Sequence, residues 1–369
     1  MIHQFSRPDI DRFIFIADIH FGVRNASIEW SDNMIDYFDN FFIPLLQNYV
    51  KQEKIAVIIA GDFFDNRKHV DINILNIGAD VMEKISNICE VFTIIGNHDI
   101  YKKQDVDVAS VRMFKYFKNV NVIYDLSEII CKDNSKILLV PWMGDHKAET
   151  ELLGKFKDED FVVMHTDIAG LAFDNGREIL DGANPNVMKK GLIISGHIHK
   201  RQESKKVIYL GAPYQLRRSD IENIKGIYSL IFNNDSHKME FIENTYSPKF
   251  LRLNLLDILD KTFEEIKNIV HNNYVDIIIK KRWMNDINVS KLIEVMDECG
   301  TKKIEIILDK NDEEIKDSSI EHSGDISIKD IFDYKLKNYE LSDLDKKTLH
   351  TMNESYLKLA TESLGGEPV

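Results

Sequence analysis

Short, uninterrupted apolar runs alternate with helical patterns over the first 250 residues. The runs lie at residues 13–17, 55–60, 91–95, 137–140, 161–164, 192–195, 207–210 and 227–232. Apolar side chains spaced three and four residues apart predict helices over residues 27–52 and 72–88. Continuous apolar strands are typical of sheets covered on both faces, and their alternation with helices predicts an α/β class. The later, closely spaced runs predict a second sheet.

The pattern changes after residue 250, which predicts a separate small domain. Strand patterns at 250–256, 274–280 and 303–308 enclose helical patterns at 262–272 and 289–299. This β-α-β-α-β order predicts a small α+β accessory domain over residues 251–308. Seven acids and few apolar side chains in residues 309–325 predict an acidic linker at 309–326. Two amphipathic helices are predicted within residues 327–369, the second capped by Ser342.

Polar motifs follow five of the apolar runs directly. They are Asp18-Ile19-His20-Phe21-Gly22, Gly61-Asp62-Phe63-Phe64-Asp65, Gly96-Asn97-His98-Asp99, the single His165, and Gly196-His197-Ile198-His199. Residues two apart in a strand share a face, and ligands of α/β proteins bind outside the carboxyl ends of the strands. The five motifs therefore predict one shared site. Its candidate ligands are Asp18, His20, Asp62, Asn97, His165, His197 and His199.

The residue types in these motifs indicate a metal centre. Imidazole, carboxylate and amide ligands together suit Mn²⁺, Fe²⁺ or Zn²⁺ better than Ca²⁺ or Mg²⁺. Two ions sharing one carboxylate account for the number of ligands, and ions about 3.5–4 Å apart stabilise both oxygens of a phosphoryl displacement. Taken singly, each motif has a simpler interpretation: a cap pair, a turn, or a core histidine. Their occurrence in order at five strand ends favours the metal centre.

Composition narrows the function classes. The chain is 44% hydrophobic and 29% charged, as in soluble folded proteins, and its apolar runs fall short of the ~18–20 residues of a membrane span. The polar start does not resemble a signal peptide. Cys89, Cys131 and Cys299 lie far apart, which argues against a disulfide framework or a cysteine zinc site and favours the cytoplasm.

The net charge of the chain bears on whether its partner is a nucleic acid. A net charge of −14, taken alone, counts against a nucleic-acid partner. Four basic doublets nevertheless follow the motifs, and as a hypothesis they form a rim that tracks phosphates around the metal site. The alternative is an ordinary solvated surface. The doublets are Arg67-Lys68, Lys102-Lys103, Lys200-Arg201 and Arg217-Arg218.

The ordered motifs resemble the calcineurin-like metallophosphoesterase superfamily, whose pattern is D-x-H, G-D-x-x-D, G-N-H-[DE], H and G-H-x-H. Within it the chain is similar to the nuclease subunits of SbcCD-type recombination complexes, especially those of T-even-like phages. Further matches are Asn66-Arg67, Pro141-Trp142-Met143 and Gly211-Ala212-Pro213, the last in place of the more usual Gly-Ser/Thr-Pro. The resemblance covers residues 12–250 by motif. It implies a four-layer αββα sandwich over residues 1–250, followed by the accessory domain and the helical pair.

The resemblance also implies a role for each motif residue. One metal ion would take Asp18, His20, Asp62 and His199, and the other Asp62, Asn97, His165 and His197, with Asp62 bridging. His98 would face the scissile phosphate, where it stabilises charge or protonates the leaving oxygen. Asp65 would orient His98 and favour its charged form. The simpler interpretation of Asp65 is an acid that caps its loop.

The function implied by the resemblance is a DNA nuclease with two Mn²⁺ ions, or Mg²⁺ or another divalent metal in their place. It would act on duplex ends as an exonuclease and on single strands as an endonuclease, in recombination and repair. The accessory domain would face the DNA, and residues 327–369 would dock on the coiled coil of an SMC-like ATPase rather than pack on their own domain. A homodimer would form through the helices at 27–52 and 72–88.

Two rival functions remain open. The first is another phosphoesterase of the same superfamily, either a protein phosphatase or a nucleotide phosphodiesterase. Residues 61–67 lack the Asp-Arg-Gly continuation of phosphoprotein phosphatases, which argues against the former. The second is a non-catalytic scaffold that kept the fold. A complete set of seven candidate ligands argues against this scaffold, since a binding module does not need two metal ions.

Overall fold

The computed structural model describes residues 2–102, 106–155, 161–233, 236–281 and 288–309. In these ranges the strands form a six-stranded, a seven-stranded and a three-stranded sheet. The predicted acidic linker, apart from its first residue, and the predicted helical pair at 327–369 lie outside the described residues and stay predictions. No helix of the described part is long and apolar enough to cross a membrane.

The six-stranded sheet carries the first three motifs. Its order is β13 (Ser236–Glu243), β12 (Gly226–Asn233), β2 (Arg12–Ile16), β3 (Ile55–Ala60), β4 (Glu90–Ile94) and β5 (Val120–Ile123). Strands β2 to β5 run parallel, so their carboxyl ends lie at one edge. Strand β12 pairs antiparallel with β2, placing Tyr228 opposite Phe15.

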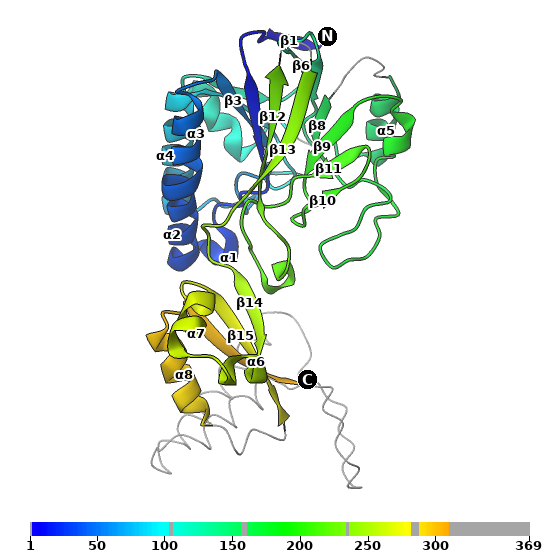
Figure 1. The fold of residues 1–369 in the computed structure, drawn as a ribbon. Coiled ribbons are helices and arrows are strands. Elements are labelled where there is room, and N and C mark those ends of the chain that lie inside the picture. Colours follow the sequence, from blue (N-terminus) through cyan, green and yellow to red (C-terminus); the bar gives the residue numbers. More distant parts are fainter. Residues whose placement is uncertain (1, 103–105, 156–160, 234–235, 282–287, 310–369) are drawn as a thin grey trace. The chain divides into compact units, whose positions relative to one another are not determined.

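The seven-stranded sheet carries the last two motifs. Its order is β1 (His3–Ser6), β6 (Ser127–Ile130), β7 (Lys136–Leu139), β8 (Phe161–His165), β9 (Leu192–Gly196), β11 (Val207–Tyr209) and β10 (Gln202–Glu203). Strands β7, β8, β9 and β11 are parallel. Helix α5 (His146–Lys155) covers its outer side (Figure 1). There Leu152 and Leu153 pack on Val162 and Ile193.

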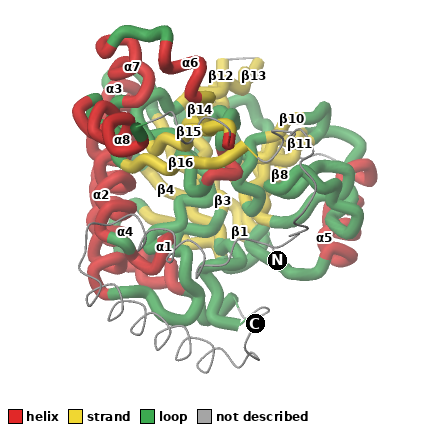
Figure 2. Tube along the Cα trace, turned by 90° about the horizontal axis from the view of Figure 1, so that it is seen from below, coloured by secondary structure: helices red, strands yellow, loops and turns green. Residues whose placement is uncertain are grey.

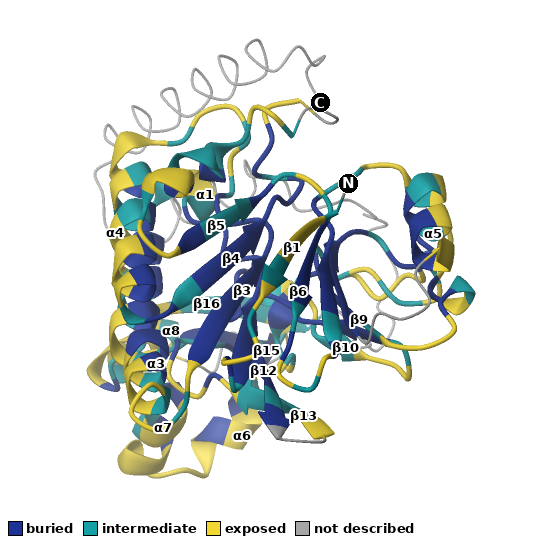
Figure 3. Cartoon of the chain, turned by 90° about the horizontal axis from the view of Figure 1, so that it is seen from above, coloured by how far each residue is buried: buried dark blue, intermediate teal, exposed yellow. Residues whose placement is uncertain are grey.

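Alternation of side chains along the strands explains the layering. In β2, Phe13 and Phe15 point into the core between the two sheets, whereas Ile14 and Ile16 point toward the helices. The helices on that side are α2 (Ile28–Tyr37), the π-helical turn η1 (Phe38–Phe42), α3 (Ile43–Tyr49) and α4 (Ile72–Ile88). Figure 3 shows the central strands buried between these layers. The predicted α/β class with helices outside two sheets is confirmed.

The predicted elements match the described ones closely, with instructive exceptions. Every predicted strand before residue 250 occurs, with its ends shifted by no more than one residue. The single helix predicted over 27–52 is instead interrupted by η1. Strands β1, β5, β6, β10 and β13 were not predicted, because they are short or carry polar side chains, and all of them except β6 lie at a sheet edge. The remaining short turns are α1 (Val23–Ala26), η2 (Ser110–Tyr116), η3 (Pro185–Val187) and η4 (Arg218–Asp220).

The segment after residue 250 forms the three-stranded parallel sheet, in the order β14 (Phe250–Asn254), β15 (Tyr274–Lys280) and β16 (Lys303–Asp309) (Figure 2). The helices α6 (Leu255–Leu259), α7 (Phe263–Val270) and α8 (Val289–Glu298) supply its core with Ile258, Val270 and Met296. Helix α7 begins with a capping box between Thr262 and Glu265. The strand predicted at 250–256 ends earlier, because α6 begins at Leu255. The domain limits themselves stay predictions.

Aromatic rings join this sheet to α2. The Trp30 ring stacks on Tyr274 with centroids 5.6 Å apart and on Phe250 at 6.0 Å. The guanidinium of Arg24 lies 4.5 Å from the centroid of Trp30, on the side of the molecule where the first motif ends. Stacked rings and a cation above them contribute both buried area and electrostatic attraction. The accessory sheet is therefore packed against the two-sheet region.

Candidate metal centre

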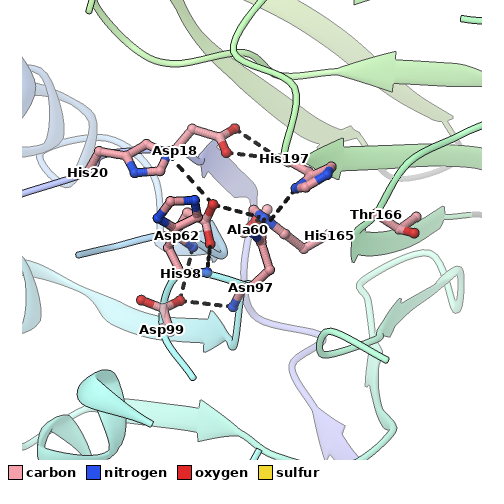
Figure 4. A network of polar contacts seen from close by, with 12 residues as sticks. Asp18, His20, Ala60, Asp62, Asn97, His98, Asp99, His165, Thr166 and His197 are labelled. Atoms are coloured by element: carbon pink, nitrogen blue, oxygen red, sulfur yellow. Dashed lines mark hydrogen bonds and ion pairs between the residues drawn. The ribbon is translucent and has the colours of Figure 1, made fainter. Parts of the chain in front are cut away.

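All seven predicted ligands converge where the parallel strands end. Asp18 and His20 follow β2, Asp62 follows β3 and Asn97 follows β4, all from the six-stranded sheet. His165 ends β8, while His197 and His199 follow β9 in the other sheet. Figure 4 shows side chains from both sheets pointing toward one another. The shared edge therefore brings together residues that are up to 181 positions apart in the chain.

One group of donors combines Asp18, His20 and His199. Each offers an atom within 4.8 Å of the others, and the Nε2 atoms of His20 and His199 are 2.9 Å apart. The backbone N–H of His197 donates to Asp18 Oδ1 at 2.9 Å, which fixes this buried carboxylate. Three converging donors of this kind form a candidate site for one divalent cation.

A second group combines Asp62, His165 and His197, again with donor atoms within 4.8 Å of one another. His165 Nε2 lies 3.2 Å from Asp62 Oδ2, and Asn97 Oδ1 lies 2.8 Å from both His165 Nε2 and His197 Nδ1. The same Asp62 oxygen is 3.6 Å from His20 Nε2 of the first group. Asp62 therefore stands between the two groups, where a bridging carboxylate is expected.

The orientation of Asn97 tests whether a cation fits. With its oxygen inward, the amide oxygen faces two imidazole nitrogens and the Asp62 carboxylate, an assembly of acceptors that a cation satisfies. With its nitrogen inward, the amide donates to His165, His197 and Asp62, and its oxygen accepts from Arg67 Nη2 at 2.8 Å. The second orientation satisfies the amide without metal, whereas in the first the amide oxygen needs a cation or a protonated imidazole beside it. The donor set fits divalent cations.

The backbone around the donors is unusual. Asp18, His20 and Asp62 have φ values of 52°, 54° and 53°, in the left-handed region that costs energy for residues other than glycine. A Cβ atom on Gly96 would lie 2.3 Å from Asp62 Oδ1, and one on Gly61 would lie 2.4 Å from His165 Nδ1. Only glycine leaves room for these donors, which explains its place before Asp62 and Asn97.

Asp99, the last residue of the third motif, organises these loops. Its buried carboxylate accepts from the backbone N–H of Asp62 at 3.0 Å, of Gly96 at 2.9 Å and of Phe63 at 3.1 Å. One side chain thus holds together the turns that follow β3 and β4. Sequence reasoning did not assign a role to Asp99, and its position next to His98 was the only signal.

The shifted pKa values of the buried groups indicate that positive charge stabilises the site. Burial disfavours the charged form of His165, but the Asp62 and Asp18 carboxylates outweigh it and raise its pKa to about 9. Burial likewise opposes ionisation of Asp62, yet His165, His20 and His98 hold its pKa well below the usual value. Burial, then the charges of His20 and Arg217, lower the pKa of His199 strongly. In the metal-free protein, protons therefore supply the positive charge that a metal cation would otherwise provide.

His98 and Asp65 are close together, but not as predicted. The Nδ1 of His98 lies 2.5 Å from the main-chain oxygen of Asp65, whereas the Asp65 carboxylate lies 3.1 Å from His20 Nδ1. The backbone of Asp65, not its carboxylate, therefore orients His98. Burial lowers the pKa of His98 overall, whereas the carbonyl oxygen and the charge of Asp65 act in the opposite direction and favour the charged form, as expected. The carboxylate instead lies beside Nδ1 of the candidate ligand His20.

The basic doublets divide into two kinds. Arg217 is half exposed, with Nη2 2.8 Å from His199 Nδ1, and Arg67 contacts the candidate site through Asn97. Lys68, Lys102 and Lys200 are exposed. These positions are compatible with a rim around the site. Lys103 lies outside the described residues.

Two other arginines of the doublets are held by protein carboxylates. Arg218 binds Asp276 Oδ1 at 2.8 Å and Glu305 Oε1 at 2.7 Å, both on the accessory sheet. Arg201 binds Glu203 at 2.6 Å and lies over the Phe241 ring. The prediction that both line a phosphate-tracking rim does not agree with these contacts, because their charges are already paired within the chain.

Comparison with known proteins agrees with this geometry. The family model of the calcineurin-like phosphoesterases matches residues 11–201, and the chain belongs to this family. It is thus a phosphoesterase with a divalent metal site. Among curated proteins, it is 28% identical over 239 residues to exonuclease subunit 1 of Enterobacteria phage T4, covering 63% of this chain and 68% of that protein.

Two other viral proteins are also similar. The putative phosphoesterase 244L of Invertebrate iridescent virus 6 is 25% identical over 60% of this chain and 76% of its own. The putative phosphoesterase 078R of Invertebrate iridescent virus 3 is 22% identical over 53% of this chain and 55% of its own. Among solved structures, a cold-active protein-tyrosine phosphatase of a psychrophilic Shewanella species matches with a TM-score of 0.30 and 12% identity, covering 65% of this chain and 82% of its own.

Proposed function

We propose that this phosphoesterase is a DNA nuclease that uses two divalent ions, Mn²⁺ in the first place, in recombination and repair. It acts on duplex ends as an exonuclease and on single strands as an endonuclease. The observation that carries the proposal is the pair of donor groups that share Asp62, with His98 beside them. Similarity to a phage exonuclease subunit supports DNA as the substrate.

The residues of the site would have two roles, metal binding and proton exchange with the substrate. Asp18, His20, Asp62 and His199 would hold one ion, and Asp62, Asn97, His165 and His197 the other. When bound, such ions supply Lewis-acid stabilisation of the negative charge on a phosphate ester. His98 donates its Nδ1–H to the Asp65 carbonyl, which leaves Nε2 to exchange a proton with a substrate oxygen. The backbone N–H of His98 donates to Asp62 Oδ1 at 2.7 Å and ties the two residues together.

A cleavage assay on matched substrates tests the proposal. Linear duplex DNA, circular single-stranded DNA and a small chromogenic phosphate ester are each incubated with Mn²⁺ or Mg²⁺. The proposal predicts Mn²⁺-dependent shortening of the duplex and opening of the circle, with His98→Ala as the inactive control. Hydrolysis of the small ester with no cleavage of either DNA would refute the nuclease while leaving a phosphoesterase.

The proposal for partner proteins rests on the sequence of residues 327–369 and on the exposed side chains of α2 and α4. Residues 327–369, outside the described structure, would dock on an SMC-like ATPase through their two amphipathic faces. A chain ending at residue 326 should lose association with the ATPase and keep metal-dependent cleavage, and retained association would refute this docking. Ile28 at the start of α2 and Ile72 at the start of α4 are 76% and 77% exposed, which supports these helices as the dimer surface.

A further inference from the structure

The two nitrogens of His197 face different groups. Nδ1 points into the second donor group and lies 2.8 Å from Asn97 Oδ1. Nε2 points away from it and lies 3.2 Å from Asp167 Oδ1. A neutral imidazole carries its proton on one nitrogen only, and the nitrogen that binds a metal must be free of it. The group that accepts the proton of Nε2 therefore decides whether Nδ1 is available.

In His165 the two ring nitrogens have the reverse roles: Nε2 faces the donor group and Nδ1 faces an acceptor outside it. Its Nδ1–H donates to the main-chain oxygen of Ala60 at 2.8 Å, which leaves Nε2 to face Asp62 and Asn97. A carbonyl oxygen fixed in β3 thus sets the tautomer of His165. His197 follows β9 and has its Nε2 turned toward a carboxylate instead. Each of the two imidazoles in this group has one nitrogen facing the donors and one facing an acceptor outside them.

Asp167 is held in place from several sides. Its side chain is 19% exposed, and its main-chain oxygen accepts from Ala183 N at 2.8 Å. His146 Nε2 lies 3.7 Å from the second carboxylate oxygen, and His146 Nδ1 lies 3.0 Å from Glu149 Oε2. The buried Glu149 also accepts from Thr166 Oγ1 at 2.6 Å. A chain of polar groups thus runs from α5 to the candidate metal centre.

Trp142 supports the ring of His197 from another direction. Its indole lies 5.4 Å from the imidazole of His197 and 6.1 Å from that of His165. The backbone N–H of Trp142 donates to Ile95 O at 2.8 Å, so the indole is anchored beside β4. Packing against a fixed ring limits rotation of the imidazoles, whereas the Asp167 carboxylate, 3.2 Å from Nε2, is the acceptor that faces the outward nitrogen of His197.

We propose that Asp167 is a positioning residue for His197, with His146 and Glu149 supporting it from α5. The carboxylate retains the proton on Nε2, presents the Nδ1 lone pair to the donor group, and increases the basicity of that nitrogen. The inference rests on the metal-binding part of the proposed function and is independent of the substrate. Three variants test it: Asp167→Ala, Asp167→Asn, which retains an oxygen acceptor, and Asp181→Asn, an exposed acid of the same loop, as the control.

Mn²⁺ binding to the full chain is titrated, with free Mn²⁺ measured by electron paramagnetic resonance. Asp167→Ala should weaken one of two sites on the order of 10–100-fold, Asp167→Asn less, and Asp181→Asn not at all. Wild-type affinity at both sites in Asp167→Ala would overturn the proposal. Absence of Mn²⁺ binding in the wild type would instead refute the metal centre itself.

A spectroscopic measurement separates positioning from general damage to the fold. Long-range ¹H–¹⁵N correlation spectra of ¹⁵N-histidine-labelled, metal-free protein report the tautomer of His197, assigned with His197→Gln. The wild type and Asp167→Asn should hold the proton on Nε2, and Asp167→Ala should show a mixture. If Asp167→Ala fails to fold, the spectrum and Mn²⁺ affinity of Asp167→Asn decide. An Asp167→Asn protein whose His197 carries its proton on Nδ1 would overturn the assignment.

Discussion

Arg218 donates from Nε to Asp276 Oδ1 at 2.8 Å and so joins the two-sheet region to the middle strand of the accessory sheet. Asp276 is 1% exposed, and Arg252 Nη2 approaches its other oxygen at 3.5 Å. The preceding residue, Arg217, lies against His199 at the candidate metal centre. Two consecutive arginines therefore connect the accessory sheet and the centre.

Removal of Arg218 should destabilise the protein. Arg218→Ala leaves a buried carboxylate with only the weaker contact to Arg252, so the free energy of unfolding should fall by about 1–3 kcal/mol. Urea unfolding measures this change. Lys291→Ala, which breaks the exposed pair with Glu294, should leave the stability nearly unchanged and serves as the control. Equal stability of Arg218→Ala and the wild type would show that the contact with Asp276 contributes nothing.

Arg217 and Arg218 should differ in DNA binding. The half-exposed guanidinium of Arg217 is available to a phosphate, so Arg217→Ala should weaken binding and reduce the slope of log K against log salt by about 1. Arg218→Ala should leave this slope unchanged, because its charge is paired within the chain. Fluorescence anisotropy over a series of salt concentrations measures both. An unchanged slope in Arg217→Ala would exclude this residue from the DNA surface.

His98 should be needed for cleavage but not for metal binding. Its side chain is fixed by the Asp65 carbonyl and its backbone by Asp62, so His98→Ala should keep the donor groups intact. Loss of a positioned proton donor or acceptor lowers the cleavage rate by about 10²–10⁴-fold. Metal content is measured by mass spectrometry on the same preparation used for the assay. A fully active His98→Ala protein would contradict the role given to this residue.

Metal affinity should rise with pH. Because the pKa of His165 is raised to about 9, its protonation stabilises the metal-free fold fully below the unfolded value of about 6.5. That stabilisation is lost as the pH rises through about 9. A divalent ion must displace this proton, so affinity should increase between these limits and binding should release protons. Calorimetry in two buffers of different ionisation enthalpy counts them, and binding without proton release would contradict the assignment.

The sequence predicts most of the central sheets because their strands are continuous apolar runs, and it predicts the candidate ligands because they directly follow five of those runs. Contacts between residues distant in the chain were not predictable in this way. Asp276 is 58 residues from Arg218, so the arginine looked like part of a free basic doublet. Asp99 and Asp167 act on groups around 30 residues or more away. Strand β13 was missed because Ser236, His237 and Lys238 begin it with polar, exposed side chains.

The central claim is that Asp62 separates two cation sites at the shared edge of the sheets. Anomalous X-ray diffraction from crystals grown with Mn²⁺ tests it most directly. The account predicts two anomalous peaks, one among Asp18, His20 and His199 and the other among Asn97, His165 and His197, with the Asp62 carboxylate between them. A map without a peak at either group, or with Mn²⁺ bound only elsewhere on the chain, would contradict it.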